Sequence, residues 1–454
     1  MAIVDNTRLM VLETLLEVEK KNIFVKEALH KLLFQKQFLS KQERSFITRM
    51  VEGITEYQVK LDYVIDCFSN KKVNKCKPLI RVVLRMGAYQ ILFMDSIPDE
   101  AACDECVKLT KKKGFHNLSG FVNGVLRNIV RNKESIHYPK KEDNLLLYYS
   151  VTYSMPIWIV EKMIAWYGEK QTEQMLKASV QPAKLTVRIN TNKTTKEECI
   201  KKIQEKDIVV EEAKYIDNAL YLDHINYVKR VPGFKEGDFF VQDESSMLLF
   251  GASGIDPTKE TTYKILDLCA APGGKCTQFG QELGDKAQIE ARDVSDKKVA
   301  LIRENVERLG IDNIVTKVWD ALVFDPDKEE WADIVIADLP CSGLGIIGKK
   351  NDIKYHVGEN QLRDLANLQR TILANASRYV KPGGILLFST CTINPEENIE
   401  NAKWFLEHFD FEPDRLGFGI PKMLQEAVNQ EYMLQLLPGV HDCDGFFIAK
   451  FRKK

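Results

Sequence analysis

The segment LDLCAAPGGK, residues 266–275, predicts an apolar strand that enters a turn of small residues and continues as a helix. Small residues let the backbone approach a ligand closely, and the first residues of a helix offer free N–H groups. A purely structural tight turn is the alternative interpretation of this segment alone. The turn lacks the GxGxxG pattern, which argues against a dinucleotide ligand.

Two acidic residues follow the turn at positions that suit a bound nucleoside. Asp293 ends the next predicted strand, where an acid commonly accepts hydrogen bonds from both ribose hydroxyls. Asp320 lies just past the third strand, where we expect it to accept from an adenine amino group. An adenosine without a pyrophosphate, as in S-adenosylmethionine, suits this set. The predicted cofactor site consists of Cys269, Ala270, Ala271, Pro272, Gly273, Gly274, Lys275, Asp293, Asp320 and Asp338.

From residue 255 onward, short β-rich segments alternate with helical segments. This alternation is typical of a parallel, doubly wound, Rossmann-like α/β sheet. The last apolar segment, residues 445–451, alternates little and is expected to form an edge strand. The predicted strands are Tyr263–Leu268, Gln288–Val294, Ile314–Val318, Ala332–Ala337 and Ile385–Thr390, and the predicted helices cover 274–283, 296–309, 361–380 and 395–408.

Two cysteines and an aspartate are expected to meet beside the cofactor. Asp338 and Cys341 follow the fourth predicted strand, and Cys391 follows the end of the fifth. The carboxyl ends of parallel strands share one edge of the sheet, which is where such sheets hold ligands. A single cysteine of this kind is often only a small buried hydrophobic residue. The three residues together predict a catalytic site.

This set of residues suits the methylation of carbon 5 of a cytosine. That carbon is too electron-poor to take a methyl group directly, but a thiolate that adds to C6 pushes electron density onto it. A free cysteine, with a pKa near ~8.5, is only a few per cent thiolate at neutral pH, so the site should lower that pKa. Asp338 placed near N3 would stabilise charge that arrives on the ring.

The first 254 residues follow a different pattern. Residues 1–140 read as helices with few prolines, and a polar, proline-interrupted linker spans 137–143. Further helices and a small α/β module at about 180–240 occupy the next part. We therefore predict an all-α domain at 1–140, linker helices and a small module at 141–254, and the catalytic domain at 255–454.

Basic residues gather in the first predicted domain. Residues 1–140 contain 24 Lys+Arg and 16 Asp+Glu, or +8, and the remainder contains 40 and 49, or −9, which sum to the net charge of −1. A basic front end indicates a phosphate-bearing partner, although lysine runs are often only solvated surface.

Other features exclude several classes of protein. The N-terminus lacks the pattern of a signal peptide, and no apolar run approaches the ~18 residues that span a bilayer. We therefore expect a cytoplasmic protein, with its ten cysteines as reduced thiols. Cys103 and Cys106 form a CxxC without a second pair at zinc-finger spacing, so no metal site is expected.

The quoted segments resemble the RNA cytosine-C5 methyltransferase family over essentially the whole chain. Four motifs match in order: LDLCAAPGGK (266–275), DLPCSGLG (338–345), STCTINPEEN (389–398) and DGFFIAKFRK (444–453). The resemblance implies S-adenosylmethionine as methyl donor, Cys391 as nucleophile, and Cys341 as the thiol that assists release of the methylated base. It also implies that Asp338 contacts the cytosine, and that Asp293 and Asp320 take the ribose and adenine of the cofactor.

The first domain is similar to the helical RNA-binding domain of the antitermination factor NusB. The matching segments are RVVLRMGAYQ (81–90), Ile97-Pro98 and GFVNGVLR (120–127). That fusion implies the family member that modifies 16S rRNA, either naked or in an early ribosomal particle. QDESS (242–246) also fits the family pattern, without a physical role that the sequence assigns. Departures at Cys276, Leu339 and residues 349–354 remove no group that the chemistry requires.

Other functions remain open at this point. A tRNA enzyme of the same family is one, and a DNA cytosine-C5 methyltransferase, which would use Cys341 as nucleophile, is another. A non-catalytic RNA-binding assembly factor would tolerate the loss of Asp338, Cys341 or Cys391, but all three are present. We predict a monomeric 16S rRNA cytosine-C5 methyltransferase without metal or membrane partners. The residues expected to contact RNA are Lys111, Lys112, Lys113 and Arg188.

Overall fold

The computed structural model describes residues 2–225 and 227–454, which divide into two compact units. The first, here the helical unit, runs to Val180 and takes in the distant segment Ile347–His356, here the strap. The second, here the sheet unit, comprises Gln181–Ile346 and Val357–Lys454. The helical unit thus extends beyond the predicted boundary at residue 140, because the helices that follow that boundary pack with it.

The helical unit is all-α, as predicted. Ser40 and Glu43 form a reciprocal capping box that begins α3, and Pro78 occupies the first turn of α5, where its missing N–H costs nothing. Apolar faces of the helices meet in one core. No described helix is long and apolar enough to cross a membrane. The helices are α1 (Ala2–Lys21), α2 (Val25–Gln35), α3 (Lys41–Glu56), α4 (Gln58–Cys67), α5 (Pro78–Phe93), α6 (Asp99–Lys112), α7 (Ser119–Asn132), α8 (Leu145–Thr152), α9 (Ile157–Ser179) and, in the strap, α14 (Ile353–His356).

The strap is bound to the rest of the helical unit by buried polar contacts. The carboxylate of Asp352 accepts a hydrogen bond from the backbone N–H of Val25, at 2.6 Å, where α2 begins. The ammonium of Lys354 donates to the carbonyls of Glu56, at 2.9 Å, and Ser154, at 2.7 Å. These contacts satisfy backbone groups at helix ends, which would otherwise be left without partners.

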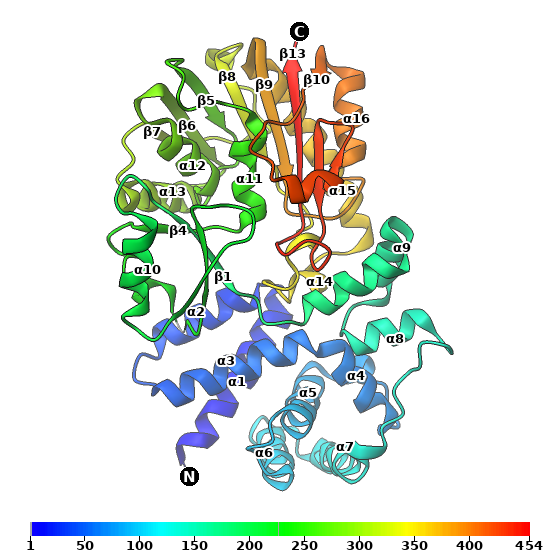
Figure 1. Ribbon diagram of the computed structural model, residues 1–454. Coiled ribbons are helices and arrows are strands. Elements are labelled where there is room, and N and C mark those ends of the chain that lie inside the picture. Colours follow the sequence, from blue (N-terminus) through cyan, green and yellow to red (C-terminus); the bar gives the residue numbers. More distant parts are fainter. Residues whose placement is uncertain (1, 226) are drawn as a thin grey trace. The chain divides into compact units, whose positions relative to one another are not determined.

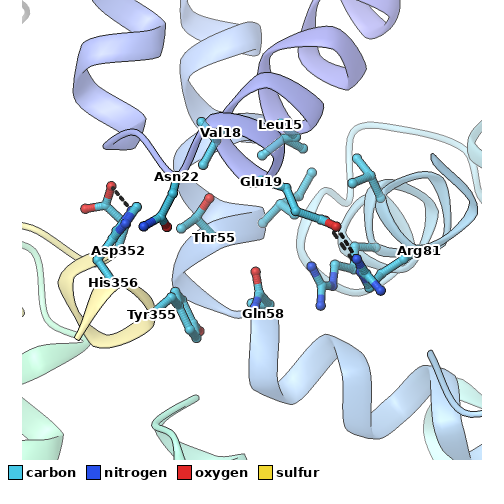
Figure 2. Close-up of a pocket in the computed structure, with 13 residues that line it drawn as sticks. Leu15, Val18, Glu19, Asn22, Thr55, Gln58, Arg81, Asp352, Tyr355 and His356 are labelled. Carbon is cyan, nitrogen blue, oxygen red and sulfur yellow. Dashed lines mark hydrogen bonds and ion pairs between the residues drawn. The ribbon is translucent and has the colours of Figure 1, made fainter. Parts of the chain in front are cut away.

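A cavity of about 300 Å³ lies between the strap and helices of the same unit. Figure 2 shows Glu19 and Arg81 paired inside it, with Asp352 beside His356 on the strap. Arg85, another lining residue, is held by both carboxylate oxygens of Asp62. Glu19 compensates Arg81, and Asp62 compensates Arg85, within the protein.

The sheet unit begins with a small antiparallel sheet of order β2-β3-β1-β4, covered by one helix. A capping box formed by Thr195 and Glu198 begins that helix, as the sequence indicates. The elements are β1 (Leu185–Ile189), α10 (Lys196–Gln204), β2 (Val209–Glu212), β3 (Ala219–Asp223) and β4 (Phe239–Val241).

The main sheet has the order β11-β12-β13-β9-β8-β5-β6-β7, with β10 paired to β13. The predicted parallel part is confirmed, because β7, β6, β5, β8 and β9 are all parallel neighbours. The strands are β5 (Tyr263–Asp267), β6 (Ala287–Asp293), β7 (Ile314–Val318), β8 (Ala332–Asp338), β9 (Val380–Thr390), β10 (Phe411–Pro413), β11 (Val428–Asn429), β12 (Met433–Leu436) and β13 (Phe446–Lys453).

The prediction of an edge strand at residues 445–451 is wrong. β13 lies between β9 and β12 and is antiparallel to both. Its residues from Phe446 to Phe451 are all buried, because both faces of the sheet are covered. A run without alternation is what a strand buried on both faces requires.

Helices cover both faces of the main sheet (Figure 1). Ile265 of β5 joins a core with α12 and α13, whereas its neighbour Leu266 joins a second core with α15 and α16. The strand order reverses between β5 and β8, and open α/β sheets hold their ligands at the carboxyl ends of the strands at such a position. The helices are α11 (Glu244–Ser253), α12 (Gly274–Leu283), α13 (Asp296–Leu309), α15 (Glu359–Tyr379) and α16 (Ile399–His408).

Candidate active site

The ends of β8 and β9 bring together the three residues predicted to be catalytic. The Sγ atoms of Cys341 and Cys391 lie 3.4 Å apart and are not joined as a disulfide. Asp338 is the last residue of β8 and pairs in register with Ser389 of β9, whose hydroxyl donates to Asp338 Oδ1 at 2.8 Å. Two parallel strands thus place two thiols and a carboxylate at one edge of the sheet.

A buried lysine completes this group of side chains. Lys275 lies in the first turn of α12, is 9% exposed, and places Nζ 2.6 Å from Asp338 Oδ2. The ammonium also lies 5.1 Å from the centre of the Phe446 ring. A carboxylate with a cation on one oxygen and a hydroxyl on the other is held in one orientation.

The two cysteines influence each other's protonation. The hydrogen bond with Cys391 and burial raise the pKa of Cys341 well above its usual range. A raised pKa means that the thiol form of Cys341 predominates at neutral pH. The prediction that the site lowers the pKa of its nucleophile concerns Cys391 and stays a prediction.

The turn predicted to hold the cofactor approaches its surroundings closely. Gly273 has a φ of +107°, which strains any residue with a side chain. A Cβ atom at Gly274 would stand 3.3 Å from Phe240. The carboxylate of Asp293 accepts from the backbone N–H of Ala271, at 3.0 Å, and lies 3.0 Å from Lys298 Nζ. Asp293 therefore fastens the turn to the end of β6.

Two further aspartates line up near the same strand ends. Asp267, the last residue of β5, is fully buried, and within the described residues neither of its carboxylate oxygens has a hydrogen-bond donor. Burial, with the nearby charge of Asp338, raises the pKa of Asp267 to about 8. Asp320 is exposed just past β7, and its Oδ1 accepts from the N–H of Leu322 at 3.0 Å. The sequence pattern indicated Asp320 but not Asp267.

Arg188 does not lie where an RNA-binding residue would, so that prediction is corrected. It is 2% exposed, and its guanidinium donates to the Gln242 side chain, to Gly274 O at 2.8 Å and to Thr277 Oγ1 at 3.0 Å. The reason is that β1 is buried on both faces, so the alternation of its residues does not turn Arg188 outward. Arg188 braces the start of α12 instead.

The same contacts give the QDESS segment a physical role. Gln242 also donates to the side chain of Gln278, at 3.2 Å, and so connects β4 to α12. Glu244 is fully buried and accepts from the backbone N–H groups of Tyr215, at 2.6 Å, and Ile216, at 2.9 Å. The segment therefore joins the small sheet to the helix that carries Lys275.

The lysines predicted to contact RNA lie at the end of α6 in the helical unit. Lys111 and Lys112 are exposed, whereas Lys113 pairs with Glu13 at 2.6 Å. Their contact with RNA stays a prediction. Among residues 2–225 and 227–454, no group of three or more His, Cys, Asp or Glu side chains is arranged to hold a metal ion.

Three protein families match successive parts of the chain. The NusB family matches residues 5–131, the ferredoxin-like domain of RsmF/B-like methyltransferases matches residues 155–229, and the family described as 16S rRNA methyltransferase RsmB/F matches residues 252–452. The order of these matches follows the chain from the helical unit to the main sheet.

Individual relatives resemble the chain over its full length. The probable ribosomal RNA small subunit methyltransferase B of Bacillus subtilis is 34% identical, with 99% of each chain covered. The crystal structure of PH0851 superposes with a TM-score of 0.80 at 26% identity and covers 98% of each chain. A methyltransferase homologue from Pyrococcus horikoshii, at 25% identity and a TM-score of 0.56, covers 68% of this chain and 99% of its own.

Proposed function

The chain belongs to the 16S rRNA methyltransferase RsmB/F family, and from this membership and the site geometry we propose which atom it modifies and how. The proposed reaction transfers a methyl group from S-adenosylmethionine to C5 of a cytosine in 16S rRNA through a covalent cysteine–C6 adduct. The observation that carries the proposal is the pair of sulfur atoms 3.4 Å apart beside Asp338.

Cys391 is the proposed nucleophile. Its sulfur adds to C6 of the cytosine, which makes C5 electron-rich enough to attack a methyl group. After the transfer, a base removes the proton from C5, the C5–H electron pair becomes the C5=C6 double bond, and the sulfur of Cys391 leaves C6 as a thiolate. Cys341, whose raised pKa keeps it a thiol, assists this release beside the attacking sulfur.

Asp338 and Lys275 form the polar wall of the proposed base site. The carboxylate is oriented by Lys275 Nζ, at 2.6 Å, and by the Ser389 hydroxyl, at 2.8 Å. Such a fixed carboxylate can bind the N3 side of the ring and stabilise charge that develops there without first reorienting. The pair therefore acts on the base, while the cysteines act on C6 and the adduct.

The cofactor turn suits an S-adenosylmethionine molecule. The glycines of the turn pack closely against neighbouring side chains. The buried Asp267 carboxyl, whose pKa is raised to about 8, would gain its negative charge beside a cationic group of the cofactor. The residues that would hold the cofactor are Cys269–Lys275, Asp293, Asp320 and Asp267. When bound, the cofactor supplies an electrophilic methyl group on its sulfonium.

The target cytosine must leave its helix to reach the cysteines at the strand ends. A base stacked in an A-form duplex cannot approach side chains at the end of a sheet, so we expect it in a loop or flipped out. The exposed Lys111 and Lys112, and the overall positive charge of the first 140 residues, are the proposed grip on flanking phosphates. An rRNA substrate implies that the enzyme acts in the cytoplasm.

The main rival activity is DNA cytosine-C5 methylation with Cys341 as nucleophile. Such an enzyme would attack with Cys341 rather than Cys391, which the cysteine variants described below distinguish. The three family matches, which include RNA methyltransferases and NusB, favour an RNA substrate.

Labelled S-adenosylmethionine, incubated with the protein and separate pools of rRNA, tRNA and DNA, tests the substrate and the modified atom. Nucleoside analysis should find 5-methylcytidine in the rRNA pool. Label in another nucleoside, or only in tRNA or DNA, would contradict the proposal.

Two cysteine variants test the covalent step. Cys391→Ser should lower the methylation rate by more than about a thousandfold, the scale on which removal of a nucleophile acts. Cys341→Ala should instead accumulate an enzyme–RNA adduct that survives denaturation and is visible as a mass shift. If an adduct formed in Cys391→Ser, or if none formed in Cys341→Ala, the proposal that Cys391 is the nucleophile would be wrong.

A further inference from the structure

A buried carboxylate joins the two loops that carry the cysteines. Glu397 lies between β9 and α16 and is fully buried. Its Oε2 accepts from the backbone N–H of Ser342, at 2.8 Å, and from Gln369 Nε2, at 3.0 Å. Its Oε1 accepts from the Ser342 hydroxyl, at 2.5 Å, and from Asn394 Nδ2, at 3.0 Å. All four bonds go to a single side chain.

These bonds hold the chain on both sides of Cys341. Ser342 follows Cys341 directly and gives Glu397 both its N–H and its hydroxyl. Gln369 donates to Glu397 and also to the carbonyl of Pro340, the residue before Cys341, at 3.0 Å. The position of the Cys341 sulfur is therefore set through Glu397.

The same network reaches the loop of the other cysteine. The hydroxyls of Ser342 and Thr392 lie 2.7 Å apart, and Thr392 follows Cys391 directly. Asn394, a donor to Glu397, also gives its backbone N–H to the Thr392 hydroxyl at 3.3 Å. One carboxylate thus connects two loops that arise from different strands.

Glu397 is bonded directly to the residue that follows Cys341, so its charge acts on that thiol. Burial raises the pKa of Glu397, while its bonds from Ser342, Asn394 and Gln369 act in the opposite direction. The carboxylate is among the groups that raise the pKa of Cys341, after the bond to Cys391 and burial. The other charged groups at this edge of the sheet, Asp338 and Lys275, compensate each other at 2.6 Å.

We propose that Glu397 is a positioning residue that holds the two sulfurs together. Through its charge, it also keeps the one proton that the ionised thiol pair retains on Cys341. Cys391 is therefore the sulfur that attacks. One proton of the thiol pair is lost to solvent. The other stays covalently bound to the sulfur of Cys341, whose S–H donates a hydrogen bond to the Cys391 thiolate, so the step needs no oxidant or co-reactant. The claim that Cys391 is the attacking sulfur rests on its proposed function as the nucleophile.

Alkylation of the two cysteines across a pH series tests the proposal without any substrate. The full-length protein is treated with iodoacetamide, and mass spectrometry follows each cysteine separately; both side chains are partly exposed. In the wild type, Cys391 should react faster near neutral pH. In Glu397→Gln, the alkylation rate of Cys341 at the same pH should rise about tenfold, which corresponds to one pKa unit. An unchanged Cys341 rate, or faster wild-type alkylation of Cys341 than of Cys391, would overturn the proposal.

Two further variants separate charge from shape. Glu397→Asp keeps the charge with a shorter side chain, so the wild-type order of alkylation should persist; a reversed order would show that charge is not the cause. This variant also decides the question if Glu397→Gln does not fold. Glu400→Gln makes the same charge change at an exposed position of α16 and should leave both rates unchanged. A shift there would mean a general effect and would also contradict the proposal.

Methylation assays with the same variants link the inference to catalysis. We expect Glu397→Gln to lower kcat while KM for S-adenosylmethionine stays the same, because the hydrogen bonds of Glu397 go to Ser342, Gln369 and Asn394 rather than to the cofactor turn. An effect on KM alone would overturn the positioning role. If Cys391 were not the nucleophile, Cys391→Ser would still methylate RNA, whereas the effect of Glu397→Gln on alkylation would be unchanged. Failure of the proposed function can therefore be told apart from failure of the proposed role of Glu397.

Discussion

Lys275 in the sheet unit and Lys354 in the helical unit are both buried, but their charges are compensated differently. Lys275 has a full counter-charge, the Asp338 carboxylate, at 2.6 Å. Lys354 donates to two main-chain carbonyls, at 2.9 and 2.7 Å, and burial lowers its pKa to about 8. A carboxylate offsets the cost of burying an ammonium far better than carbonyl dipoles do. The reaction site therefore carries a compensated charge, whereas the strap carries a charge that pH can remove.

Replacement of Lys275 removes the compensated pair and should have the largest effect of these tests. In Lys275→Met, Asp338 loses its cation, so kcat should fall by about 10²–10³, as when one preorganised electrostatic partner is removed from a site. Single-turnover methylation measures this loss. The matched control is Lys297→Met, an exposed lysine of α13, which should keep wild-type activity. Equal activity of the two variants would mean that the pair is only structural.

Replacement of Lys354 should change how stability depends on pH. Its pKa is lowered from 10.5 to about 8 on folding, so between these values the unfolded chain binds more protons and the free energy of unfolding rises with pH. Below that window the cost of the buried charge is fully present. The contribution amounts to about 3 kcal/mol at most, because each pKa unit corresponds to about 1.4 kcal/mol.

Urea unfolding at a series of pH values, for the wild type and Lys354→Met, isolates this contribution. The rise through the window should be smaller in the variant. Parallel pH profiles for the two proteins would show that Lys354 does not titrate as its surroundings imply.

Arg188 extends the comparison to a buried guanidinium whose hydrogen-bond acceptors, among the described residues, are uncharged. Arg188→Lys cannot reproduce its contacts with Gln242, Gly274 and Thr277, so the start of α12 should loosen and the Kd for S-adenosylmethionine should rise about tenfold, or about 1.4 kcal/mol. Calorimetry measures this change, and the exposed Arg230→Lys serves as control. RNA binding should keep its salt dependence; a flatter dependence would restore the interpretation of Arg188 as an RNA contact.

The lysines at the end of α6 provide the opposite extreme, because Lys111 and Lys112 leave their charges in water and Lys113 pairs with Glu13 at the surface. Changing Lys111, Lys112 and Lys113 to Gln should weaken rRNA binding modestly and reduce the slope of log Kd against log salt by about one for each phosphate that the variant no longer neutralises. Lys403→Gln, an exposed lysine of α16, should leave the slope unchanged. An unchanged slope in the triple variant would place the RNA elsewhere.

Sequence patterns predicted the parallel half of the main sheet because its strands are short, apolar and separated by periodic helices. They also predicted that Asp338, Cys341 and Cys391 would share one edge, since parallel strands end on the same side. The C-terminal strand was misplaced, because a run such as Phe446–Phe451 does not tell which strands flank it. Pairing across distant segments decides that, and a single sequence does not record it.

Individual polar side chains were harder to predict than strands. Arg188 lies between Val187 and Ile189, a pattern that equally suits a polar residue facing water, and only the covering helix α12 turns it into a brace. Glu397 stands next to Glu396 in an irregular segment, so no periodicity indicates which of the two is buried. The three lysines of the strap, Lys349, Lys350 and Lys354, would suggest a solvent-exposed loop, yet the side chain of Lys354 is buried at 3% exposure.

The strap also has a consequence for the order in which the protein is assembled. Ribosomes release the chain from its N-terminus, and domains generally fold as units as they emerge. The helical unit departs from this rule, because Asp352 and Lys354 supply contacts at the start of α2 and the end of α3. These residues are translated only after β1 to β8 of the sheet unit. The contacts of the strap with α2 and α3 can therefore form only after this later segment has been translated, and a gene truncated behind Val180 encodes the helical unit without its strap.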